Sequence, residues 1–523
     1  MARSKARVYT CCALMLLCVI SIIVCICVLM RPRGKCPEDT FSKAAVAADS
    51  GKCSEIGRDI LQRGGSAVDG AIATLLCTSI MNPQSMGIGG GMSHLFKGKV
   101  TIINSRETVP KNVTPDLLKS CPKTFTLVAG SKWIGIPGEI RGYEVAHKLY
   151  GKLPWAALFQ PTIQLAREGF PIPPALKHSP SSLCLCPLGM KFEKLADTLE
   201  MIANHGPNAF YTGKIAEDLI RDIQEAGGTL TLQDLAEYSV TVSDAWAVPL
   251  GAYQMYIPPP PAGGIILSLI LNIMKGYHYN SASLTGEQKT QVYHHYVEAF
   301  KFANGLKKHI RDPKFSSEVD SFANHIRSLI SSDKTHDAQY YNMTPYLDSM
   351  GTTHVSVLAE DGSAVSVTST INHIFGSKIF SSSTGIILNN ELSDFCGRAE
   401  SLFPGEQPPS SMAPTVIKSQ SKTLVIGSTG GSMITTGMAL MNHLWFGKSL
   451  KEAIAAPVVF VDSENAVKFE SSFDKNVIEG LKALGHNHQT AKYFYNVVNA
   501  VEKEDGCIRA VSDARKLGEP AGY

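Results

Sequence analysis

The 523-residue sequence lacks a strong excess of either charge. Its 49 Lys and Arg residues nearly balance 46 Asp and Glu residues, which leaves a formal net charge of +3. It also lacks zinc-finger and RNA-binding signatures, and its cysteine spacing resembles no zinc site. These absences argue against a basic surface that would select nucleic acid. What is present is an ordinary globular balance, 44% hydrophobic and 18% charged, with ample length for a large core.

Long hydrophobic runs are scarce as well. A single stretch, Val8 to Met30, has 23 residues without a charge. That length suits a membrane-spanning helix and exceeds a typical signal-peptide core. Because no small-residue cleavage site precedes the charged flank at Arg31, we predict a single-pass signal anchor at 8–30. A cytoplasmic tail at 1–7 would precede it.

The flanking charges decide the orientation of this anchor poorly, because basic residues stand on both sides of it. The short N-terminal tail favours an extracellular position for the bulk of the chain. Two glycosylation sequons, at 112–114 and 342–344, favour the same side, although the proline after each weakens it as an acceptor. We expect a type II protein of the plasma membrane with an extracellular catalytic part. Outside the anchor, Cys36 and Cys53 could form one disulfide bridge.

Helix and strand patterns follow along the rest of the chain. Asp69, three residues after Ser66, indicates a capping-type helix start. Farther on, the chain becomes polar, which is typical of an exposed loop. The expected elements are a strand at 43–48, helices at 54–63, 66–80 and 285–307, a strand at 99–106 and a loop at 312–350.

Two segments suggest cofactor or metal chemistry at first sight. The glycine-rich turn at 86–91 lacks the third glycine of a dinucleotide-binding fingerprint, because Met92 stands there, and a helix precedes it where a strand is needed. Close backbone packing is the better interpretation. His294, His295 and Glu298 lie on the long predicted helix but fit no metalloprotease pattern. We expect them to be packed or solvated helix residues.

The segment at 352–372 predicts a hairpin. Two β-rich runs flank Asp361-Gly362, a pair that is typical of two-residue hairpin loops. If this pair forms the loop, Thr353 lies opposite Thr370, and Thr352 lies opposite Ile371. The Thr370 hydroxyl then lies beside the start of the first strand, unless the register slips by one residue.

Thr352, at the start of this hairpin, is a candidate nucleophile. A threonine hydroxyl needs an adjacent base, and cleavage of the Gly351–Thr352 bond would supply a free α-amine with a pKa of roughly 7.7–8. One residue would then carry both nucleophile and base. The alternative is an ordinary strand threonine after a loop, and this segment taken alone favours that alternative.

Three residue pairs could complete a site around such a nucleophile: Gly430 and Gly431, Ser410 and Ser411, and Glu391 and Asp394. The glycines end a strand, TLVIGSTGG, ahead of a predicted helix at 432–445, so their N–H groups could stabilise an oxyanion. The serines could bind a carboxylate, and the acids could bind an ammonium group. Each pair also has an ordinary interpretation as a tight turn, a serine turn or solvated acids.

Taken together, these segments closely resemble the γ-glutamyltransferase family. Segments such as AAVAADS, TGIILNNEL and VPLGAY look like its γ-glutamyl leukotrienase branch. The resemblance covers nearly all of the chain after the anchor. Its longest blocks, in chain order, are GRDILQRGGSAVDGAIA from Gly57, NPQSMGIGGG from Asn82, INSRETVP from Ile103, PPPPAGG from Pro258, the Thr352 hairpin, PSSMAPT from Pro409, GSTGGS from Gly427 and the C-terminal GEPAGY.

The resemblance implies an α+β fold of the N-terminal-nucleophile hydrolase type, an αββα sandwich with two sheets between helical layers. It also implies a precursor that cleaves itself. The large extracellular subunit would be 31–351, and the small catalytic subunit would be 352–523. The two would remain together as a heterodimer.

The resemblance also assigns roles to residues. Thr352 matches the nucleophile, Thr370 the residue that supports it, and Gly430 and Gly431 the oxyanion hole. Arg106, Ser410 and Ser411 match contacts to the α-carboxylate of a γ-glutamyl group, and Asn372, Glu391 and Asp394 match residues around its α-amino group.

The implied reaction moves γ-glutamyl groups from glutathione and its conjugates, including leukotriene C4, through an acyl-enzyme on Thr352. Water, an amino acid or a dipeptide would accept the group, and no metal or organic cofactor is expected. Two alternatives stay open. The stretch at 171–195 is shorter than its family equivalent, which would suit a non-catalytic surface protein that keeps the fold for binding. An N-terminal-nucleophile amidase of different acyl specificity is the other.

Overall fold

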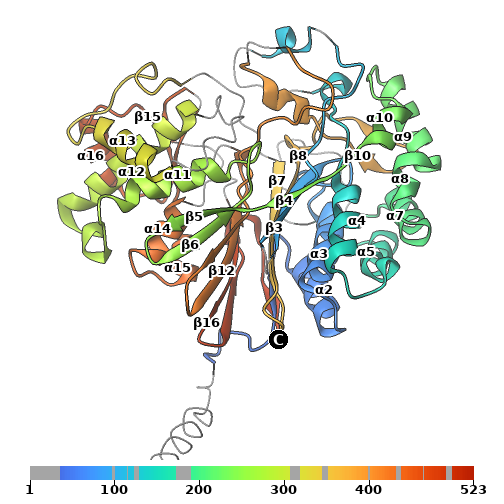
Figure 1. Ribbon diagram of the computed structural model, residues 1–523, viewed down its shortest axis with the longest axis horizontal. Coiled ribbons are helices and arrows are strands. Elements are labelled where there is room, and N and C mark those ends of the chain that lie inside the picture. The colour runs from blue at the N-terminus through green and yellow to red at the C-terminus, as the bar shows by residue number, and fades with distance from the viewer. Residues whose placement is uncertain are drawn as a thin grey trace, which may run out of the picture. The chain divides into compact units, whose positions relative to one another are not determined.

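Two β-sheets lie face to face at the centre of the computed structural model, and helices cover the outer face of each (Figure 1). All these elements belong to one unit, Phe41–Tyr523, whereas Met1–Thr40 form a second unit of which residues 36–40 are described. The structure describes residues 36–96, 100–114, 116–122, 129–171, 173, 190–306, 319–343, 351–398, 401–431, 437–462, 464–490 and 497–523.

The first sheet has seven antiparallel strands in the order β18-β1-β7-β8-β2-β3-β4. The central strands β7 and β8 are buried along their whole length. The bounds are β1 Ala45–Ala47, β2 Gly91–Phe96, β3 Thr101–Asn104, β4 Thr241–Asp244, β7 Gly351–Leu358, β8 Ala364–Asn372 and β18 Ala521–Gly522.

The second sheet has six antiparallel strands in the order β17-β16-β12-β11-β6-β5. Strands β12 and β16 pack on β7 of the first sheet. The bounds are β5 Trp246–Leu250, β6 Tyr253–Ile257, β11 Thr415–Lys418, β12 Lys422–Ser428, β16 Val498–Glu504 and β17 Cys507–Val511. Both sheets therefore mix strands from before and after Thr352, so a cut there would leave the two parts interleaved.

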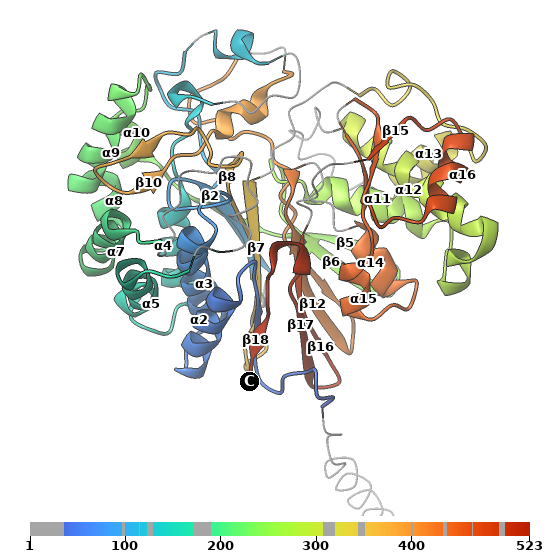
Figure 2. The ribbon, with the colours of Figure 1, turned by 180° about the vertical axis from the view of Figure 1, so that it is seen from behind.

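The helical layers stand on opposite sides of this pair of sheets (Figures 1 and 2). The layer on the first sheet contains α2 Gly51–Gln62, α3 Ala67–Met81, α4 Glu139–Tyr150, α5 Trp155–Glu168, α7 Glu193–His205, α8 Asn208–Thr212, α9 Lys214–Glu225 and α10 Leu232–Glu237. The other side holds α11 Gly264–Lys275, α12 Gly286–Leu306, α13 Val319–Leu329, α14 Gly437–Leu444, α15 Leu450–Ala455 and α16 Lys475–Ala483. The layers agree with the predicted αββα sandwich.

Strand β1 shows how the sequence builds these layers. Side chains alternate between the two faces of a strand. Ala45 and Ala47 accordingly lie in the apolar cluster between the sheets, while Val46 lies in the cluster beneath the first helical layer. Small residues on the inner face let the sheets approach closely.

The predicted capping-type start of the helix at 66–80 is confirmed. The Ser66 hydroxyl accepts from the N–H of Asp69 at 3.1 Å, and the Asp69 carboxylate accepts from the N–H of Ser66 at 2.8 Å, which completes the capping box of α3.

Among the described residues, no helix is both long and apolar enough for a bilayer. The predicted anchor at 8–30 lies outside the described residues and stays a prediction.

The predicted hairpin forms, but its register is wrong by one residue. Thr352 pairs with Thr370, because the loop has three residues, 360–362, between Ala359 and Ser363. Gly362 takes a positive φ of 76°, which is typical of a turn that closes with a bulge. The Asp361-Gly362 pair therefore fills the last two positions of a longer loop.

Two other expectations are wrong. Cys53 forms a disulfide with Cys77 of α3, so it cannot bridge to Cys36; Cys121 pairs with Cys396. The polar stretch at 312–350 contains helix α13, which packs on α11 through an apolar face that includes Ala323 and Ile326. Local polarity concealed a short amphipathic stripe there.

Candidate active site

The start of β7 brings Thr352 and Thr370 directly opposite each other. The Thr352 hydroxyl donates to Oγ1 of Thr370 at 3.3 Å, and the Thr370 hydroxyl donates to the carbonyl of Gly351 at 2.5 Å. Both side chains are almost fully buried. A bulge interrupts the strand pairing between Gly351 and Thr352. The hydroxyl of Thr370 therefore polarises the carbonyl that precedes the candidate nucleophile.

Gly351 itself has little room for a side chain. A Cβ there would lie 2.5 Å from the carbonyl oxygen of His373 and 2.7 Å from that of Asn372. The glycine turn of the NPQSMGIGGG block lies behind the opposite strand, where a Cβ on Gly90 would approach the Thr370 carbonyl to 2.1 Å. The close-packing interpretation of that turn is confirmed.

His354 is the histidine nearest to Thr352 in sequence, which makes it a rival for the role of base. Its ring nitrogens lie within hydrogen-bonding distance of Thr368 Oγ1, at 2.8 Å, and Ser356 Oγ, at 3.0 Å. Burial lowers its pKa to about 3, so the ring stays neutral at physiological pH. Its nitrogens are already used within the sheet, which leaves it poorly suited to activate the Thr352 hydroxyl.

Arg106 and two acids form a second centre. Its guanidinium pairs with Glu391 Oε2 at 2.6 Å and with Asp394 Oδ2 at 2.7 Å. Glu391 and Asp394 belong to the short helix η6, Glu391–Phe395, and Arg106 follows β3. We call Arg106, Asn372, Glu391 and Asp394 the clamp.

Asn372 connects the clamp to Thr370, the residue opposite Thr352. It ends β8 with a positive φ of 73°, and its Nδ2 donates to Asp394 Oδ1 at 2.9 Å. Its N–H donates to Thr370 Oγ1 at 2.7 Å. Within the described residues, Asn372 Oδ1 and Glu391 Oε1 are buried acceptors without a hydrogen-bond donor. Such acceptors suit an ammonium group.

The clamp holds more carboxyl groups than its single guanidinium can neutralise. Burial raises the pKa of Glu391 well above its ordinary value and that of the neighbouring Glu107 to about 8, although the Arg106 charge opposes both shifts. Burial alone would lower the pKa of Arg106, but the attraction of Glu391, Glu107 and Asp394 outweighs it and raises that pKa. The arginine therefore stays charged, and the acids compete for it.

Ser410 and Ser411 lie on a loop that also touches Arg106. The carbonyls of Pro408 and Pro409 accept from its Nε and Nη2 at 3.3 and 3.1 Å. The Ser410 hydroxyl accepts from the N–H of Met412 at 3.1 Å, and both serines are half-buried. The structure thus places the serine pair directly after two residues whose carbonyls bond to Arg106.

Gly430 and Gly431 form the turn that follows β12. Their φ angles of 113° and 66° lie in the region that favours glycine, and both residues are buried. Helix α14, Gly437–Leu444, confirms the later part of the helix predicted at 432–445, and 432–436 lie outside the described residues. We call 429–431 the oxyanion turn.

Sequence reasoning missed two residues beside Thr352, the candidate nucleophile. Lys516 Nζ donates to the carbonyl of Thr352 at 2.7 Å and forms an ion pair of 3.0 Å with Asp49 Oδ2. Asp49 ends the AAVAAD segment, and Lys516 stands just before GEPAGY. Asp49 lies within a segment that carries the family resemblance and Lys516 lies two residues before another, so both places in the sequence were a usable signal.

The predicted helix residues His294, His295 and Glu298 are packed, as expected. His294 and Glu298 come close to His486, and together these three could offer ligand atoms within 4.8 Å of one another. However, the rings of His294 and His486 already bond each other at 2.8 Å, and the Lys301 ammonium lies 3.3 Å from Glu298. These groups saturate one another as a buried polar network.

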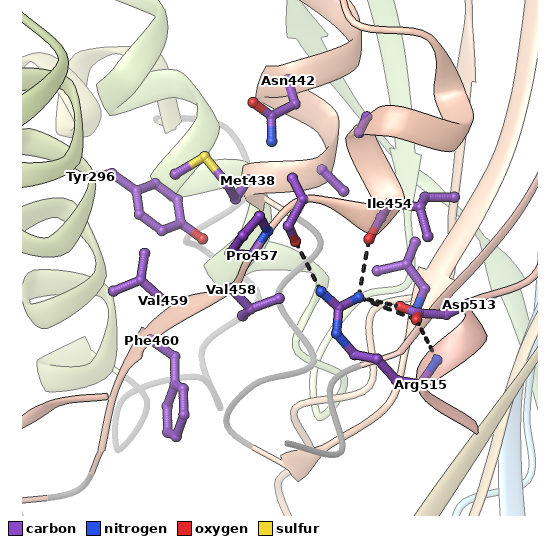
Figure 3. Close-up of a pocket in the computed structure, with 14 residues that line it drawn as sticks. Tyr296, Met438, Asn442, Ile454, Pro457, Val458, Val459, Phe460, Asp513 and Arg515 are labelled. Carbon is purple, nitrogen blue, oxygen red and sulfur yellow. Dashed lines mark hydrogen bonds and ion pairs between the residues drawn. The ribbon is translucent and has the colours of Figure 1, made fainter. Parts of the chain in front are cut away.

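A separate pocket lies between α12, α14 and the C-terminal segment (Figure 3). Arg515 is its most polar lining residue, and it donates to the carbonyls of Ile454 at 3.1 Å and Ala456 at 3.0 Å and to the carboxylate of Asp513. The protein itself therefore uses these donors, and none of the predicted site residues lines this pocket.

Comparison with known proteins gives consistent results. The family model described as "Gamma-glutamyltranspeptidase" matches residues 53–182 and 189–523. The chain is 44% identical to glutathione hydrolase 5 proenzyme of Rattus norvegicus over 96% of its own length and 97% of the relative's. It is 43% identical to the protein of the same name from Homo sapiens, with 96% of each chain covered.

A solved structure shares the fold. The cephalosporin acylase from Bacillus halodurans superposes with a TM-score of 0.82 at 24% identity, covering 92% of this chain and 96% of the other. At this identity the likeness concerns the fold alone.

Proposed function

Because this chain belongs to the γ-glutamyltranspeptidase family, we propose that it is a γ-glutamyl hydrolase and transferase that acts on glutathione and glutathione conjugates. The observation that carries this proposal is the junction at Asn372. This residue binds Thr370 with its main chain and Asp394 with its side chain. A γ-glutamyl group held by the clamp would therefore present its γ-carbonyl towards Thr352.

The first step is self-cleavage. The Thr352 hydroxyl attacks the carbonyl carbon of Gly351, while the Thr370 hydroxyl, bonded to that carbonyl oxygen, stabilises the developing negative charge. The C–N bond between Gly351 and Thr352 breaks, and the proton of the Thr352 hydroxyl passes to the departing nitrogen, which becomes the free α-amine of Thr352. Water then hydrolyses the ester left on Thr352 Oγ1, which restores the hydroxyl and leaves a carboxylate on Gly351. The ordinary pKa of this amine, roughly 7.7–8, suits a general base at neutral pH.

The clamp then binds the donor. The α-carboxylate of the γ-glutamyl group pairs with Arg106 and with Ser410 and Ser411. The α-ammonium takes the carboxylates of Glu391 and Asp394. The two unpartnered acceptors, Glu391 Oε1 and Asn372 Oδ1, support this assignment, because burial without a donor is costly.

Acyl transfer completes the cycle. The α-amine takes the proton of the Thr352 hydroxyl, which attacks the γ-carbonyl, and the N–H groups of Gly430 and Gly431 bind the resulting oxyanion. The amide bond breaks, the leaving amine takes the proton, and an acyl-enzyme remains. Water or an amine acceptor then attacks this ester. Every step uses groups of the chain and its substrates.

Three finer points belong to the same proposal. The relatives are named as proenzymes, which supports self-cleavage into 31–351 and 352–523. The likeness to the leukotrienase branch favours bulky conjugates such as leukotriene C4 as donors. The uncharged run at 8–30 supports a type II anchor in the plasma membrane with the catalytic part outside.

The test compares wild type with Thr352→Ala and Thr352→Ser. Denaturing gels of reduced wild-type protein should show two fragments, the smaller beginning at Thr352 by N-terminal sequencing. Thr352→Ala should stay intact and lose about 10⁴-fold or more of γ-glutamyl anilide hydrolysis. Thr352→Ser, which keeps a hydroxyl, should still be cut. Cleavage of the alanine variant at this bond would refute the nucleophile assignment.

A further inference from the structure

Lys516 is a buried lysine whose ammonium is shared between three segments of the fold. Nζ donates to the carbonyl of Thr352 at 2.7 Å and to Oγ1 of Thr429 at 3.0 Å, and it pairs with Asp49 at 3.0 Å. An ammonium group has three donors, so this set is complete. Its side chain is 6% exposed, which leaves little solvent to replace any of the three acceptors.

Asp49 extends this network along β7. Its Oδ2 also accepts from the Thr353 hydroxyl at 2.8 Å, and its Oδ1 accepts from Asn499 Nδ2 at 2.7 Å. The same nitrogen of Asn499 donates to the carbonyl of His354 at 2.8 Å. Three consecutive residues at the start of β7 are thus fixed by polar groups of neighbouring segments.

This arrangement has a consequence once the chain is cut before Thr352. A new chain terminus loses the covalent tether that held it and tends to fray. In the uncut chain the tether is Gly351, which β8 holds through the hydroxyl of Thr370. After the cut, the donation from Lys516 to the Thr352 carbonyl remains and adds to the pairing of Thr352 with Thr370 on β8.

Thr429, the second acceptor of the Lys516 ammonium, connects Thr352 to the oxyanion turn. Thr429 precedes the glycines of the oxyanion turn, and its N–H donates to Val497 at 3.0 Å. One ammonium therefore joins the residue that carries the nucleophile to the turn that would bind the oxyanion. Acyl transfer depends on the distance between these two groups, and an error of about 1 Å can cost a hundredfold in rate.

We propose that Lys516 is a positioning residue for acyl transfer, which holds the cut end of β7 at Thr352 in register with the oxyanion turn. The inference rests on the proposed function. Asp49 neutralises the ammonium in this buried place and anchors Thr353 beside it. Lys516 does not contact any clamp residue in the described part of the chain, so it acts on the rate of the chemistry and leaves donor binding unchanged.

The test uses the full-length chain and three variants. Lys516→Met keeps the length of the side chain and removes its donors, Lys516→Arg keeps a charged donor, and Thr429→Val removes one acceptor. For each we would measure processing by gel, the unfolding temperature, and kcat and KM for a γ-glutamyl anilide. The matched control is Lys422→Met, a lysine on β12 that is 13% exposed and pairs with Glu502 at 3.0 Å.

For processed Lys516→Met we expect kcat to fall about tenfold to a hundredfold with KM unchanged, and Lys516→Arg should recover part of the loss. Thr429→Val should lose a few-fold in kcat. Lys422→Met should lower the unfolding temperature and leave kcat as it was. If Lys516→Met folds but is not cut, the kcat of processed Thr429→Val decides in its place.

Other outcomes overturn it. If wild type is cut and active but processed Lys516→Met keeps its kcat within about twofold, the inference fails and the proposed function stands. If Lys516→Met does not fold, Thr429→Val decides, and an unchanged kcat there refutes the link to the oxyanion turn. If wild type itself is uncut and inactive, both proposals fail together.

Discussion

Two buried charged groups near Thr352 differ in how fully their surroundings are hydrogen-bonded. One is the ammonium of Lys516, and the other is the guanidinium of Arg106 in the clamp. At Lys516 each ammonium donor has an acceptor at 2.7–3.0 Å. At Arg106 three carboxyl groups share one guanidinium, and acceptors on Glu391 and Asn372 have no hydrogen-bond donor among the described residues. A satisfied network fixes a geometry, whereas an unsatisfied one keeps binding capacity for a ligand. The comparison therefore indicates that the Lys516 network positions Thr352 and that the clamp binds a ligand.

Among the changes that test this comparison, removal of the clamp arginine should have the largest effect. Arg106→Ala leaves buried acids without their cation, which costs about 3–5 kcal/mol for such a pair. We expect kcat/KM for γ-glutamyl anilides to fall about 10²- to 10³-fold, with self-cleavage retained, because Thr352 and Thr370 do not depend on the guanidinium. Arg167→Ala, an arginine that is 42% exposed, is the control. An equal loss on substrates without a γ-glutamyl group would contradict the assignment.

The next prediction tests the surroundings of Thr352. In Gly351→Ala the new methyl group would meet the carbonyls of His373 and Asn372, and overpacking of this kind costs about 1–3 kcal/mol. Processing should slow about fivefold to a hundredfold, followed as the fraction cut over time on gels, while donor KM of the processed fraction stays unchanged. Gly87→Ala, where a Cβ meets nothing within 4 Å, should be processed at the wild-type rate.

A smaller effect concerns the support of the clamp. The Cys121–Cys396 disulfide joins the part before Gly351 to the residue after the short helix that carries Glu391 and Asp394. A Cys121→Ser/Cys396→Ser variant should raise donor KM about twofold to tenfold, because the loosened helix must be ordered on binding. A Cys53→Ser/Cys77→Ser variant is the control for the loss of a disulfide within one fragment.

The same bridge predicts the behaviour of the cut protein. Without reductant, the two fragments should remain joined on denaturing gels, and peptide mapping should recover the peptides of Cys121 and Cys396 as a linked pair. Recovery of these peptides separately, in the absence of reductant, would contradict the pairing.

The smallest expected effect comes from the titration of Glu139. Glu139 accepts hydrogen bonds from Tyr143 and from Ser369, the neighbour of Thr370. Burial raises its pKa from 4.5 to about 8, so between these values the folded protein keeps a proton that the unfolded chain releases. Its favourable contribution is complete below about pH 4.5 and is lost as the pH rises towards 8.

The measurement is the unfolding temperature from pH 5 to 8. Wild type should lose several degrees over this range, and Glu139→Gln, which does not titrate, should show a flatter profile. Glu107, whose pKa is also about 8, contributes to the pH dependence of the unfolding temperature, and Glu139→Gln leaves that contribution in place. Parallel profiles for the two proteins would show that Glu139 does not bind the extra proton.

Local sequence signals predicted the elements and the individual groups of the site. The capping box at Ser66, the hairpin around Asp361-Gly362 and the glycine turn at 430–431 each follow from short-range chemistry. The hairpin register failed because two-residue and three-residue loops with this pair differ by one residue. Helix α13 was missed because its apolar face becomes evident only once α11 covers it.

The sequence by itself determined that Thr352 lies at the start of a buried strand beside Thr370. It also showed that the chain contains acids, an arginine and glycine turns that could complete a site. Only the tertiary structure decided which of them meet. Lys516, Asp49 and Thr429 lie far from Thr352 in sequence, yet the fold brings them together, and Lys516 bonds to the Thr352 carbonyl, to Asp49 and to Thr429. Contacts of this kind leave no periodic trace in a sequence, since their spacing is fixed by packing between layers and not by the repeat of any helix or strand.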